Sequence, residues 1–569
     1  MPAIFTPLTR PTKTTGLRYW MLQVLEQCDN VAADFSPDSV HDLRVALRRC
    51  RSMADGLMAL DPDPAWKEMK KTGKRLFQRL GDLRDIHVME EWISKLEKTE
   101  KTHMAAGESP AGPEVDRNID SSPDSLNKQT DHADAPAQAL LKILHARENE
   151  QKREAQSALE EFDRKQWRRW CRSLPPRAAR IRPGSPLFKH LALERWAEAR
   201  ALHSRALRNR SQAAFHILRI GIKRFRYIVE NFLPVEHKAW GNDLKKIQDL
   251  LGEVHDFDVL WSTAVSCGVF SDVESRQSWH ERILTVRSKR IENYRATMVG
   301  DNSLWQVWRA ALPQGKQIQE LATRRMKLWA SNLDPDCSHS ERVASLAVQL
   351  YDGLLAIAWQ PAIDAVSARF SLFAAALLHD VGKFKGEKNH HKKSLKLVQA
   401  HGNPLGWKSA DFHRASIVAR FHRGALPTRR HNLLRDLLPD EQKATIQLAA
   451  ILRLANALDA GHDGHIRSVQ VERAQIENVR ADNVGGNNVR GKRNDRQKRV
   501  AGFLVKPLPL ARNQPLIITA QGYTPLGRTA RTIAAERYLL EIVLHRPVVV
   551  RAITNSESRR TRLPSRRSR

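Results

Sequence analysis

The chain has 569 residues, which is enough for two or more domains, and 94 Lys and Arg against 63 Asp and Glu give it a formal net charge of +31. Such an excess of positive charge favours an acidic partner, either nucleic acid, an anionic membrane or a phosphate polymer. The sequence has no apolar run of the roughly 18 to 20 residues that a membrane helix needs, no signal peptide, and no CxxC among its five cysteines, so we expect a cytoplasmic protein without a disulfide framework.

A basic helical motif occurs twice, at residues 41–51 and again at 216–226, with the same spacing H-x2-R-x3-[RK]-R-x-R. Because successive residues of an α-helix are about 100° apart, the first, fourth, eighth and eleventh positions of each copy lie on one face. The two cationic stripes are formed by His41, Arg44, Arg48 and Arg51 and by His216, Arg219, Lys223 and Arg226, and the remaining basic position holds Arg49 or Arg224. Like charges four residues apart destabilise a lone helix by a few tenths of a kcal/mol, so two such stripes predict a polyanionic ligand.

The duplication extends beyond the basic motif. A segment containing Leu-Gly follows each copy, at residues 80–85 (LGDLRD) and 251–256 (LGEVHD), which predicts a repeated helical unit with a shared central groove. Residues 104–137 are rich in Ser, Pro, Asp and Gly, and this composition predicts a disordered insertion in the first half.

The doubled motif resembles the two halves of a CHAD domain, the histidine-bearing α-helical domain that binds inorganic polyphosphate. The resemblance covers residues 10–312. It implies a helical pseudo-dimer whose basic faces line a central pore or cleft for the phosphate chain, with the basic motif residues named above as ligands. Arginine forks and lysine ammonium groups suit this task, because polyphosphate offers only charged oxygens.

Two other interpretations of the basic helices remain open. An Arg-rich helix face is commonly a solvated surface, and a basic protein also attracts nucleic acid. Aromatic residues make up only 6% of the chain, and the basic helices lack regularly interleaved stacking residues, which argues against nucleic acid. The arginine-rich tail at 551–569 is either a solvated extension or a non-specific polyanion contact.

A second set of residues has the pattern of a metal site. The apolar stretch 373–378 ends in His379 and Asp380, which can both reach one ion at a helix end. His339 and Asp459 each stand on an otherwise apolar helical row, and a carboxylate there costs several kcal/mol unless it is paired or binds a metal. Two imidazoles and two carboxylates suit a divalent ion, either Mn, Mg, Fe or Zn. Buried polar groups without a metal are the alternative.

This H…HD…D pattern resembles the HD superfamily of metal-dependent phosphohydrolases. The accompanying NHH at 389–391, LG at 405–406 and RFHRG at 420–424 are similar to the C-terminal HD-like region of the exopolyphosphatase/guanosine pentaphosphate phosphatase family. In that family an N-terminal actin-like domain performs catalysis, and this sequence shows no such domain. We therefore expect the HD site to have chemistry of its own.

The resemblance implies a role for each motif residue. The implied metal ligands are His339, His379, Asp380 and Asp459, with a second metal position formed by His422 and by His391 or its neighbour His390. Asp380 would also orient the attacking water. Lys383 and Arg423 would contact the substrate phosphate, and the metal would neutralise its oxygens.

The predicted fold is mainly α: a duplicated CHAD helical bundle at 10–312, an all-α HD domain at 315–470 and a small C-terminal α+β subdomain at 471–550. In this subdomain we expect a flexible loop at 474–499, strand-like pieces at 502–505 and 516–520, and one helix at 529–544.

The expected function is that of a metal-dependent phosphohydrolase that binds inorganic polyphosphate, free or in granules. Its substrate would be polyphosphate or a related phosphoanhydride or phosphodiester. The alternative is a non-catalytic polyphosphate-binding or granule-associated scaffold with a degenerate HD domain, and a third interpretation is an RNA-binding protein. A Glu-x-Glu-x-Lys pattern at 148–152 would mark triphosphate-tunnel chemistry if it lay on a strand, but it stands in a helical stretch and we attribute it to chance.

Overall fold

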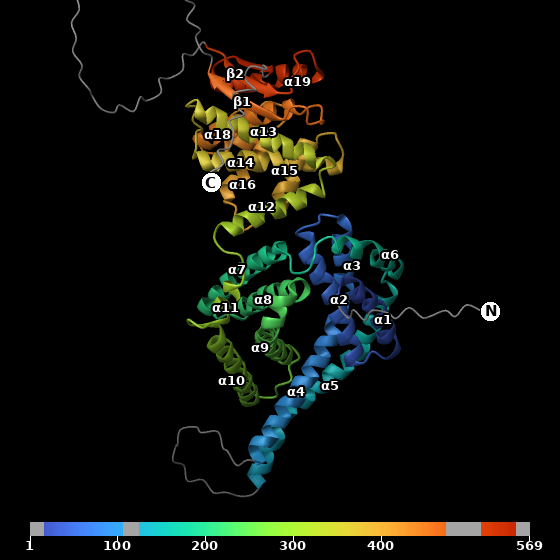
Figure 1. Cartoon of the computed structure of the whole chain (residues 1–569). Helices are drawn as coiled ribbons and strands as arrows, with labels where there is room; N and C mark the ends of the chain where they lie inside the picture. The colour runs from blue at the N-terminus through green and yellow to red at the C-terminus, as the bar shows by residue number, and fades with distance from the viewer. Residues whose placement is uncertain (1–15, 106–123, 474–513, 553–569) are drawn as a thin grey trace, which may run out of the picture. The chain divides into compact units, whose positions relative to one another are not determined.

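The computed structural model describes residues 16–105, 124–473 and 514–552, and it is mainly helical, as predicted (Figure 1). The chain divides into two compact units, Met1–Arg325 and Met326–Arg569. Among the described residues, no helix is long and apolar enough to cross a membrane.

The first unit contains two successive sets of helices. The first set is α1 (Leu17–Asp34), α2 (Pro37–Met58), α3 (Pro64–Arg79), α4 (Gly81–Ala105), α5 (Asp124–Glu160) and α6 (Arg164–Ala178). The second set is α7 (Pro186–Asn209), α8 (Gln212–Phe232), α9 (Pro234–Ser266), α10 (Val273–Met298) and α11 (Leu304–Ala310). The single helix α9 carries the second Leu-Gly segment, whereas the first lies where α3 ends and α4 begins. The two halves therefore repeat the same order of helices, with α3 and α4 merged in the second.

The two motif helices, α2 and α8, pack against each other where the halves meet. Gly56 permits a close approach here, because a Cβ atom at this position would lie only 2.4 Å from the ring of Phe232. Next to this contact, Asn231 Nδ2 donates a hydrogen bond of 3.0 Å to Ser52 Oγ. The contact joins the C-terminal parts of both helices and so brings their basic faces to one region of the unit.

The predicted disordered insertion differs from the structure in its second part. Helix α5 begins at Asp124, so residues 124–137 are helical, while 106–123 lie outside the described residues. The helix extends this far because Ala137 and Leu140 are buried in an apolar cluster that also includes Phe257 of α9. Composition alone does not reveal that packing.

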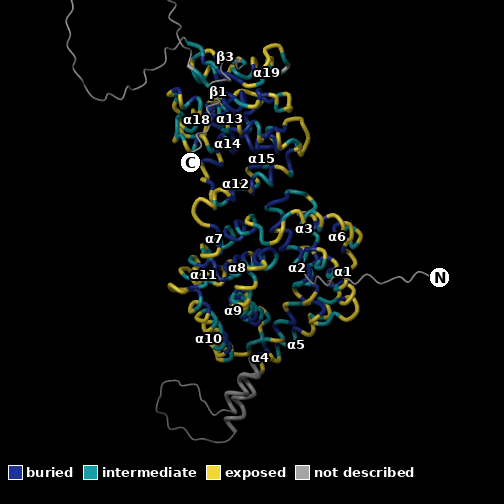
Figure 2. The backbone as a smooth tube through the Cα atoms, in the orientation of Figure 1, coloured by how far each residue is buried: buried dark blue, intermediate teal, exposed yellow. Residues whose placement is uncertain are grey.

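The second unit is a helical bundle with a small sheet. Its helices are α12 (Lys316–Ser331), which crosses the boundary between the units, α13 (Cys337–Ala356), α14 (Ala365–Leu378), η1 (Val381–Lys385), α15 (His390–His401), α16 (Ser409–Arg420), α17 (Asn432–Arg435), α18 (Pro439–Leu458), α19 (Arg528–Glu536) and α20 (Tyr538–Leu544). Helix α14 runs through the interior, where Figure 2 shows most of its length buried. It delivers the His379–Asp380 pair to the core.

The sheet has the order β1-β2-β3, with β1 (Ser468–Arg473) antiparallel to β2 (Leu516–Gln521) and β2 parallel to β3 (Val548–Ala552). The predicted strand at 516–520 agrees with β2, whereas β1 and β3 were not expected. The helix predicted at 529–544 is two helices that meet at Arg537, whose side chain donates to the carbonyl oxygen of Val548. The loop at 474–499, the strand at 502–505 and the tail from 553 onward lie outside the described residues.

Candidate metal centre and basic site

Each motif helix begins at a serine N-cap that stands at the same distance before its histidine. Ser36 Oγ accepts a hydrogen bond from Ser39 N at the start of α2, and Ser211 Oγ accepts one from Ala214 N at the start of α8, both 3.2 Å long. An N-cap satisfies a backbone donor that the helix cannot. The equal offset places the basic residues of both copies on equivalent faces.

Six basic side chains of the two helices are half-buried together, and we call them the basic site. They are Arg44, Arg48 and Arg51 of α2 and Arg219, Lys223 and Arg226 of α8. On the α2 side, Phe77 of α3 supports two of them. Arg44 Nη1 donates 2.8 Å to its carbonyl oxygen, and the guanidinium groups of Arg44 and Arg51 lie 4.0 and 4.9 Å from the centre of its ring.

The positive charges of the basic site repel one another. Burial, together with the positive charges of Arg219 and Arg48, lowers the pKa of Lys223 to about 7. Burial also lowers the pKa of Arg44 to about 10, although Asp85 opposes the shift. A lysine that shares its surroundings with arginines from both helices shows that the two cationic stripes face one region. A bound anion would relieve this repulsion.

The basic site also holds unused hydrogen-bond donors. The Nε atoms of Arg51, Arg219 and Arg226 are buried without an acceptor among the described residues. A buried donor without a partner costs about 1–3 kcal/mol. The acidic groups near the site are fewer than the six basic ones: Asp55, Asp85, Asp256 and Glu230. The arrangement is therefore left with spare positive charge and spare donors.

The remaining basic motif residues lie at the margin of the basic site or outside it. Arg49 Nη2 forms an ion pair of 2.5 Å with Glu230 of α8. Arg224 is exposed and pairs with Glu198 of α7 at 2.9 Å. His41 is exposed at the start of the α2 stripe.

Two residues of the Leu-Gly segments also belong to this region. His216 Nδ1 lies 3.3 Å from Nδ1 of His255 on α9. Burial lowers the pKa of His41, and the positive charge of Arg84 on α4 adds to this effect. The sequence analysis identified both segments but assigned no role to Arg84 or His255. The matched position of Arg84 and His255 in the duplication was the signal that would have identified them.

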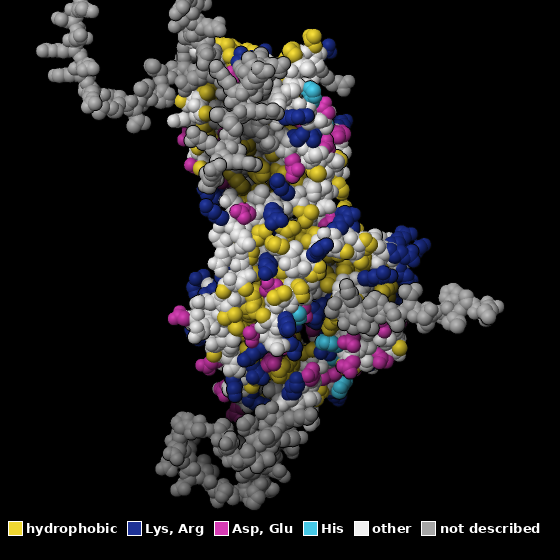
Figure 3. Space-filling model, in the orientation of Figure 1, with side chains coloured by type: hydrophobic (Ala, Val, Ile, Leu, Met, Phe, Trp, Pro, Cys, Tyr) yellow, Lys and Arg dark blue, Asp and Glu magenta, His cyan; other side chains and the backbone are white. Residues whose placement is uncertain are grey.

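Positive charge is not confined to this site. Figure 3 shows Lys and Arg side chains gathered over α6, whose sequence RKQWRRWCRSLPPRA contains no acid. The net charge therefore cannot by itself locate a ligand. The unsatisfied donors and the depressed pKa of Lys223 distinguish the basic site from such a solvated surface.

In the second unit, tight packing fixes the chain around His379 and Asp380. Ser394 Oγ donates 2.6 Å to the carbonyl oxygen of His379 and accepts from Gly382 N at 2.9 Å. A Cβ atom at Gly382 would lie 2.1 Å from the carbonyl oxygen of His390, so only glycine fits there. This contact holds the start of α15 against η1 and brings His390 to the end of α14.

Four histidines, His339, His379, His390 and His422, surround the Asp380 carboxylate, and we call these five residues the histidine cluster. The distances from the histidine Nε2 atoms to the nearer carboxylate oxygen are 3.1 Å for His390, 3.4 Å for His379, 3.6 Å for His422 and 3.9 Å for His339. Lys383 Nζ lies 2.6 Å from Oδ2. Asp380 and the four histidines are each at most 2% exposed.

Backbone hydrogen bonds fix the tautomer of three of these histidines. Nδ1 of His379, His390 and His422 lies 2.7, 2.9 and 2.8 Å from the carbonyl oxygens of Ala376, Glu387 and Ala419, three residues earlier in each case. A carbonyl oxygen only accepts, so Nδ1 carries the proton and the neutral ring presents the Nε2 lone pair to Asp380. Metal-binding histidines commonly have this arrangement.

The Nε2 atoms of the cluster lie close to one another and to the Asp380 carboxylate. Nε2 of His390 and Nε2 of His422 are 3.1 Å apart. Nε2 of His379 and Oδ1 of Asp380 are buried without a hydrogen-bond partner among the described residues. Burial lowers the pKa of His422 well below its ordinary value. The imidazoles, His379 foremost, and the Lys383 ammonium lower the pKa of Asp380 although burial opposes its ionisation. Imidazole nitrogens gathered around a buried ionised carboxylate are a donor set that suits a cation.

The donor atoms form two groups that share Asp380. His339, His379 and Asp380 make one group, and Asp380, His390 and His422 make the other. Within each group the donor atoms lie within 4.8 Å of one another. The sequence left open whether His390 or His391 belongs to the second metal position, and the structure has His390 in that group. His391 is half-buried outside both groups, with its ring centre 6.3 Å from that of His422.

Asp459 occupies a supporting position. Its Oδ2 lies 2.7 Å from His339 Nδ1 and accepts from Arg342 Nε at 2.9 Å. The His339 ring stacks on His462 with centres 3.8 Å apart, and its Nε2 lies 3.0 Å from the amide of Asn456. Asp459 therefore orients His339, and neither group of donor atoms includes it. Its role as a metal ligand stays a prediction.

The predicted phosphate contacts have different positions. Lys383 forms an ion pair with Asp380, whereas Arg423 is exposed and, in the described part of the chain, forms no hydrogen bond or ion pair with the cluster. Burial lowers the pKa of His391 to about 4, and the charges of Arg420 and Arg423 add to this effect. Nη1 of Arg420 is buried without a hydrogen-bond partner among the described residues. Sequence reasoning gave Arg420 no role.

Comparison with known protein families found one match in each half of the chain. Residues 21–265 match the CHAD domain, and residues 323–483 match domain III of the Ppx/GppA phosphatases. Comparison with curated proteins found no match. The two matched segments fall in the units that carry the basic site and the histidine cluster.

Proposed function

Because the chain joins a CHAD domain to a domain of the Ppx/GppA type, a pairing that relates it to polyphosphate, we propose that it captures inorganic polyphosphate and cleaves phosphate bonds. The basic site would bind the polymer. The histidine cluster would bind divalent metal and hydrolyse a phosphoanhydride or phosphodiester bond. Polyphosphate is the simplest substrate, because binding at one site raises its effective concentration at another site of the same chain.

The proposal of polymer binding rests on the unpaired hydrogen-bond donors and the excess positive charge of the basic site. The buried Nε donors of Arg51 and Arg219 have no hydrogen-bond acceptor among the described residues, and burial and neighbouring arginines lower the pKa of Lys223. Polyphosphate presents oxygens and negative charge along its length and would supply both. Its binding should weaken steeply with salt, as for other phosphate polymers.

The proposal of metal binding rests on the histidine Nε2 atoms that lie close to one another and to the Asp380 carboxylate. Two Nε2 lone pairs 3.1 Å apart, on His390 and His422, repel each other unless a cation or proton lies between them. Since their Nδ1 atoms hold the ring protons, a divalent cation satisfies all the facing atoms at once. Imidazole and carboxylate donors suit Mn, Fe, Zn or Mg.

The residues of the cluster and Lys383 divide into holding and contacting roles. His339, His379, His390, His422 and Asp380 would hold the metal. When bound, the metal would neutralise phosphoryl oxygens and lower the pKa of a coordinated water toward about 7. The Lys383 ammonium lies 2.6 Å from Asp380 and compensates the carboxylate, and it would contact a substrate phosphate.

A scaffold without catalysis is the second candidate, and one contact favours it. Lys383 compensates the charge of Asp380 in the absence of any other cation, so the cluster can exist as a buried ion pair. In that case the second unit would be a structural or granule-associated module.

The deciding experiment measures bound metal and phosphate release from long-chain polyphosphate for the wild type, for Asp380→Ala and for a His41/Arg44/His216/Arg219 alanine variant. The proposal expects release by the wild type, none by Asp380→Ala, and mainly weaker binding in the basic variant. Asp352→Ala is the matched control, because Asp352 is an exposed carboxylate that pairs with Arg369. Tight polymer binding without metal uptake or release under any metal would establish the scaffold instead.

A further inference from the structure

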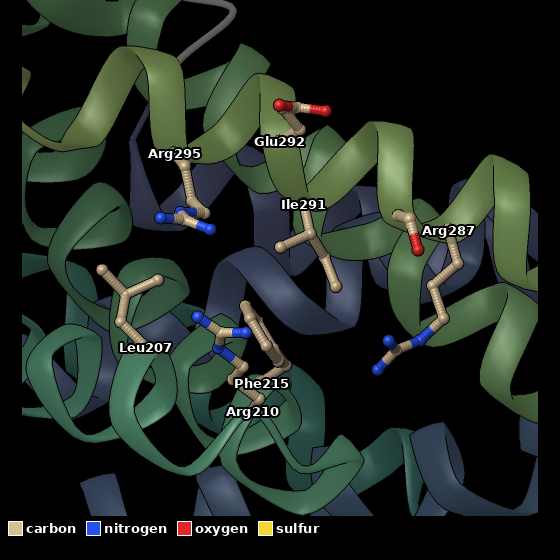
Figure 4. A pocket seen from close by; sticks show the side chains of 8 residues that line it. Leu207, Arg210, Phe215, Arg287, Ile291, Glu292 and Arg295 are labelled. Atoms are coloured by element: carbon tan, nitrogen blue, oxygen red, sulfur yellow. The ribbon is translucent and has the colours of Figure 1, made fainter.

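A cavity of about 360 Å³ lies in the second half of the first unit, between α7, α8 and α10 (Figure 4). Its main lining residues are Leu207, Arg210, Phe215, Arg287, Ile291 and Arg295. The last three stand four residues apart on α10 and so share one face of that helix. None of the lining residues belongs to the basic site, and the volume is that of a small-molecule pocket.

The charge of this cavity is positive and mostly uncompensated. Among the described residues, Arg210 and Arg295 form no ion pair, whereas Arg287 Nε donates 2.8 Å to Asp258 Oδ1. Glu292 is the acidic lining residue, and Figure 4 shows its carboxylate pointing away from the space between the helices. The guanidinium groups of Arg210 and Arg295 approach the cavity from opposite sides. Both arginines are exposed, and each guanidinium group can form charge-assisted hydrogen bonds to a phosphate.

The cavity also has an apolar surface. Phe215 is 3% exposed, and the side chains of Leu207 and Ile291 face the same space. Inorganic polyphosphate has no apolar part, so it would leave this surface unused. A ligand with both a phosphate and an apolar or planar group would use the whole lining, because an arginine also stacks on planar rings.

The duplication shows that Arg210 is specific to the second half. Phe35 and Arg210 stand at equivalent positions before His41 and His216, and both are helix C-caps in the left-handed region, with φ of 50° and 53°. The backbone conformation is therefore common to the repeated unit. The first half has an aromatic ring where the second has a guanidinium group.

We propose that this cavity binds a small phosphorylated molecule of the nucleoside monophosphate class, with the phosphate held by Arg210 and Arg295 and the planar group on Phe215, Leu207 and Ile291. The site is independent of polymer capture and of the histidine cluster. It gives the chain a binding site for a small phosphorylated effector beside its polymer site.

The test uses the full chain with Arg48→Ala/Arg219→Ala to weaken the basic site, in a buffer with a metal chelator. Calorimetry would measure the binding of adenosine, guanosine, cytidine and uridine 5′-monophosphates, of the free nucleosides, of inorganic phosphate and of tripolyphosphate. Two further changes target the cavity: Arg210→Ala/Arg295→Ala removes both guanidinium groups, and Ile291→Trp fills the space. Arg276→Ala/Lys289→Ala removes two exposed charges from α10 outside the cavity and is the matched control.

The expected result is that at least one monophosphate binds, and that both cavity variants weaken it by about tenfold or more. The control should change the affinity by less than about twofold, and the nucleosides, phosphate and tripolyphosphate should bind more weakly than the monophosphate. The proposal is overturned if no monophosphate binds, if inorganic phosphate binds as well as the nucleotide, or if folded Arg210→Ala/Arg295→Ala and Ile291→Trp proteins keep the affinity. Circular dichroism establishes the folding of each variant.

Discussion

The basic site and the histidine cluster both assemble groups that repel one another, but they do so at different depths and with different charges. The basic site holds charged guanidinium and ammonium groups that are half-buried. The cluster holds imidazoles around one carboxylate, each at most 2% exposed. The first is complementary to an anion and the second to a cation.

The difference in burial follows from the size of the expected ligands. A polymer extends beyond any one site, so its binding groups stay partly exposed to water, which limits the cost of their charge. A single metal ion can be surrounded, so its ligands can be fully buried, provided that they are neutral or compensated. Lys223 and Asp380 show the difference: burial and neighbouring cations lower the pKa of the lysine to about 7, whereas the positive charge and hydrogen bonds of surrounding imidazoles and of Lys383 lower the pKa of the carboxylate.

The largest effect is expected from Asp380, because both groups of donor atoms share it. Asp380→Asn should remove metal from both groups and reduce phosphate release by about three orders of magnitude, since the Lewis-acid contribution is several kcal/mol. His390→Ala should affect only the group that contains His390. Metal content by mass spectrometry, measured together with activity, distinguishes the two variants.

His413→Ala is the control for loss of an imidazole, because His413 is exposed on α16 and belongs to neither group. If Asp380→Asn retains the full metal content of the wild type, the shared carboxylate is not a ligand and the comparison between the two sites fails.

The next effect concerns the basic site. Arg48→Ala/Arg219→Ala should weaken polyphosphate binding by about a hundredfold or more, because each charge-assisted hydrogen bond contributes about 1.5–3 kcal/mol. The dependence of affinity on salt should also become less steep, since fewer cations contact the polymer. Titrations at several salt concentrations measure both quantities.

Arg224→Ala provides the contrast within the same motif. Arg224 is exposed and pairs with Glu198, so its loss should change the affinity by less than about threefold. Equal losses in the two variants would mean that net charge, rather than the arrangement of the basic site, attracts the polymer.

The basic stripes could be predicted from sequence because helix geometry alone decides which residues share a face. Arg44, Arg48 and Arg51 are half-buried together, as their spacing indicates. Helix geometry left Arg224 outside the stripe, and it was expected to be a ligand only because it belongs to the motif that resembles a CHAD domain. Glu198 of α7 shows that Arg224 faces another neighbour, and long-range partners of this kind are absent from any local pattern.

The cluster was harder to predict where two identical residues are adjacent. His390 and His391 differ only in helix rotation, which is set by Asn389 at φ 59° before α15 and by the tight contact of Gly382 with His390. The H…HD…D spacing indicated that His379 and Asp380 lie near His339. It did not show that Asp459 turns toward His339 Nδ1 and Arg342, because that depends on the end of α18.

A smaller effect should appear with pH in the basic site. The pKa of Lys223 is lowered to about 7, so the free protein loses this charge as pH rises through 7, whereas a bound anion favours the charged form. Polyphosphate affinity should therefore fall up to about tenfold between about pH 6 and 8, with proton uptake on binding. The unfolded chain keeps this proton up to about pH 10.5, so the stability of the free protein should rise between about pH 7 and 10.

Other titratable groups face the same region and must be separated from Lys223. Burial first, and then neighbouring arginines, lower the pKa of His41, His216 and His255, the last to about 4, so these rings gain protons at lower pH. Burial raises the pKa of Asp256. Lys223→Met should flatten the profile and Lys245→Met, at an exposed position of α9, should leave it unchanged; an unchanged profile in Lys223→Met contradicts the assignment. Calorimetry in buffers of different ionisation enthalpy measures the proton uptake.

The smallest effect tests whether stability and binding oppose each other in the basic site. Glu230 joins the halves, because it pairs with Arg49 of α2 at 2.5 Å and lies 3.7 Å from Arg226 Nε of its own helix. Glu230→Gln should destabilise the first unit by about 1–2 kcal/mol, since it leaves half-buried guanidinium groups without a counter-charge. The same change should strengthen polyphosphate binding by about threefold, because an acidic competitor is removed. Glu198→Gln, which frees the exposed Arg224, is the matched control and should change neither quantity appreciably. Thermal unfolding and polymer titration of the two variants measure both effects, and a Glu230→Gln protein that loses stability without gaining affinity would show that Glu230 only joins the halves.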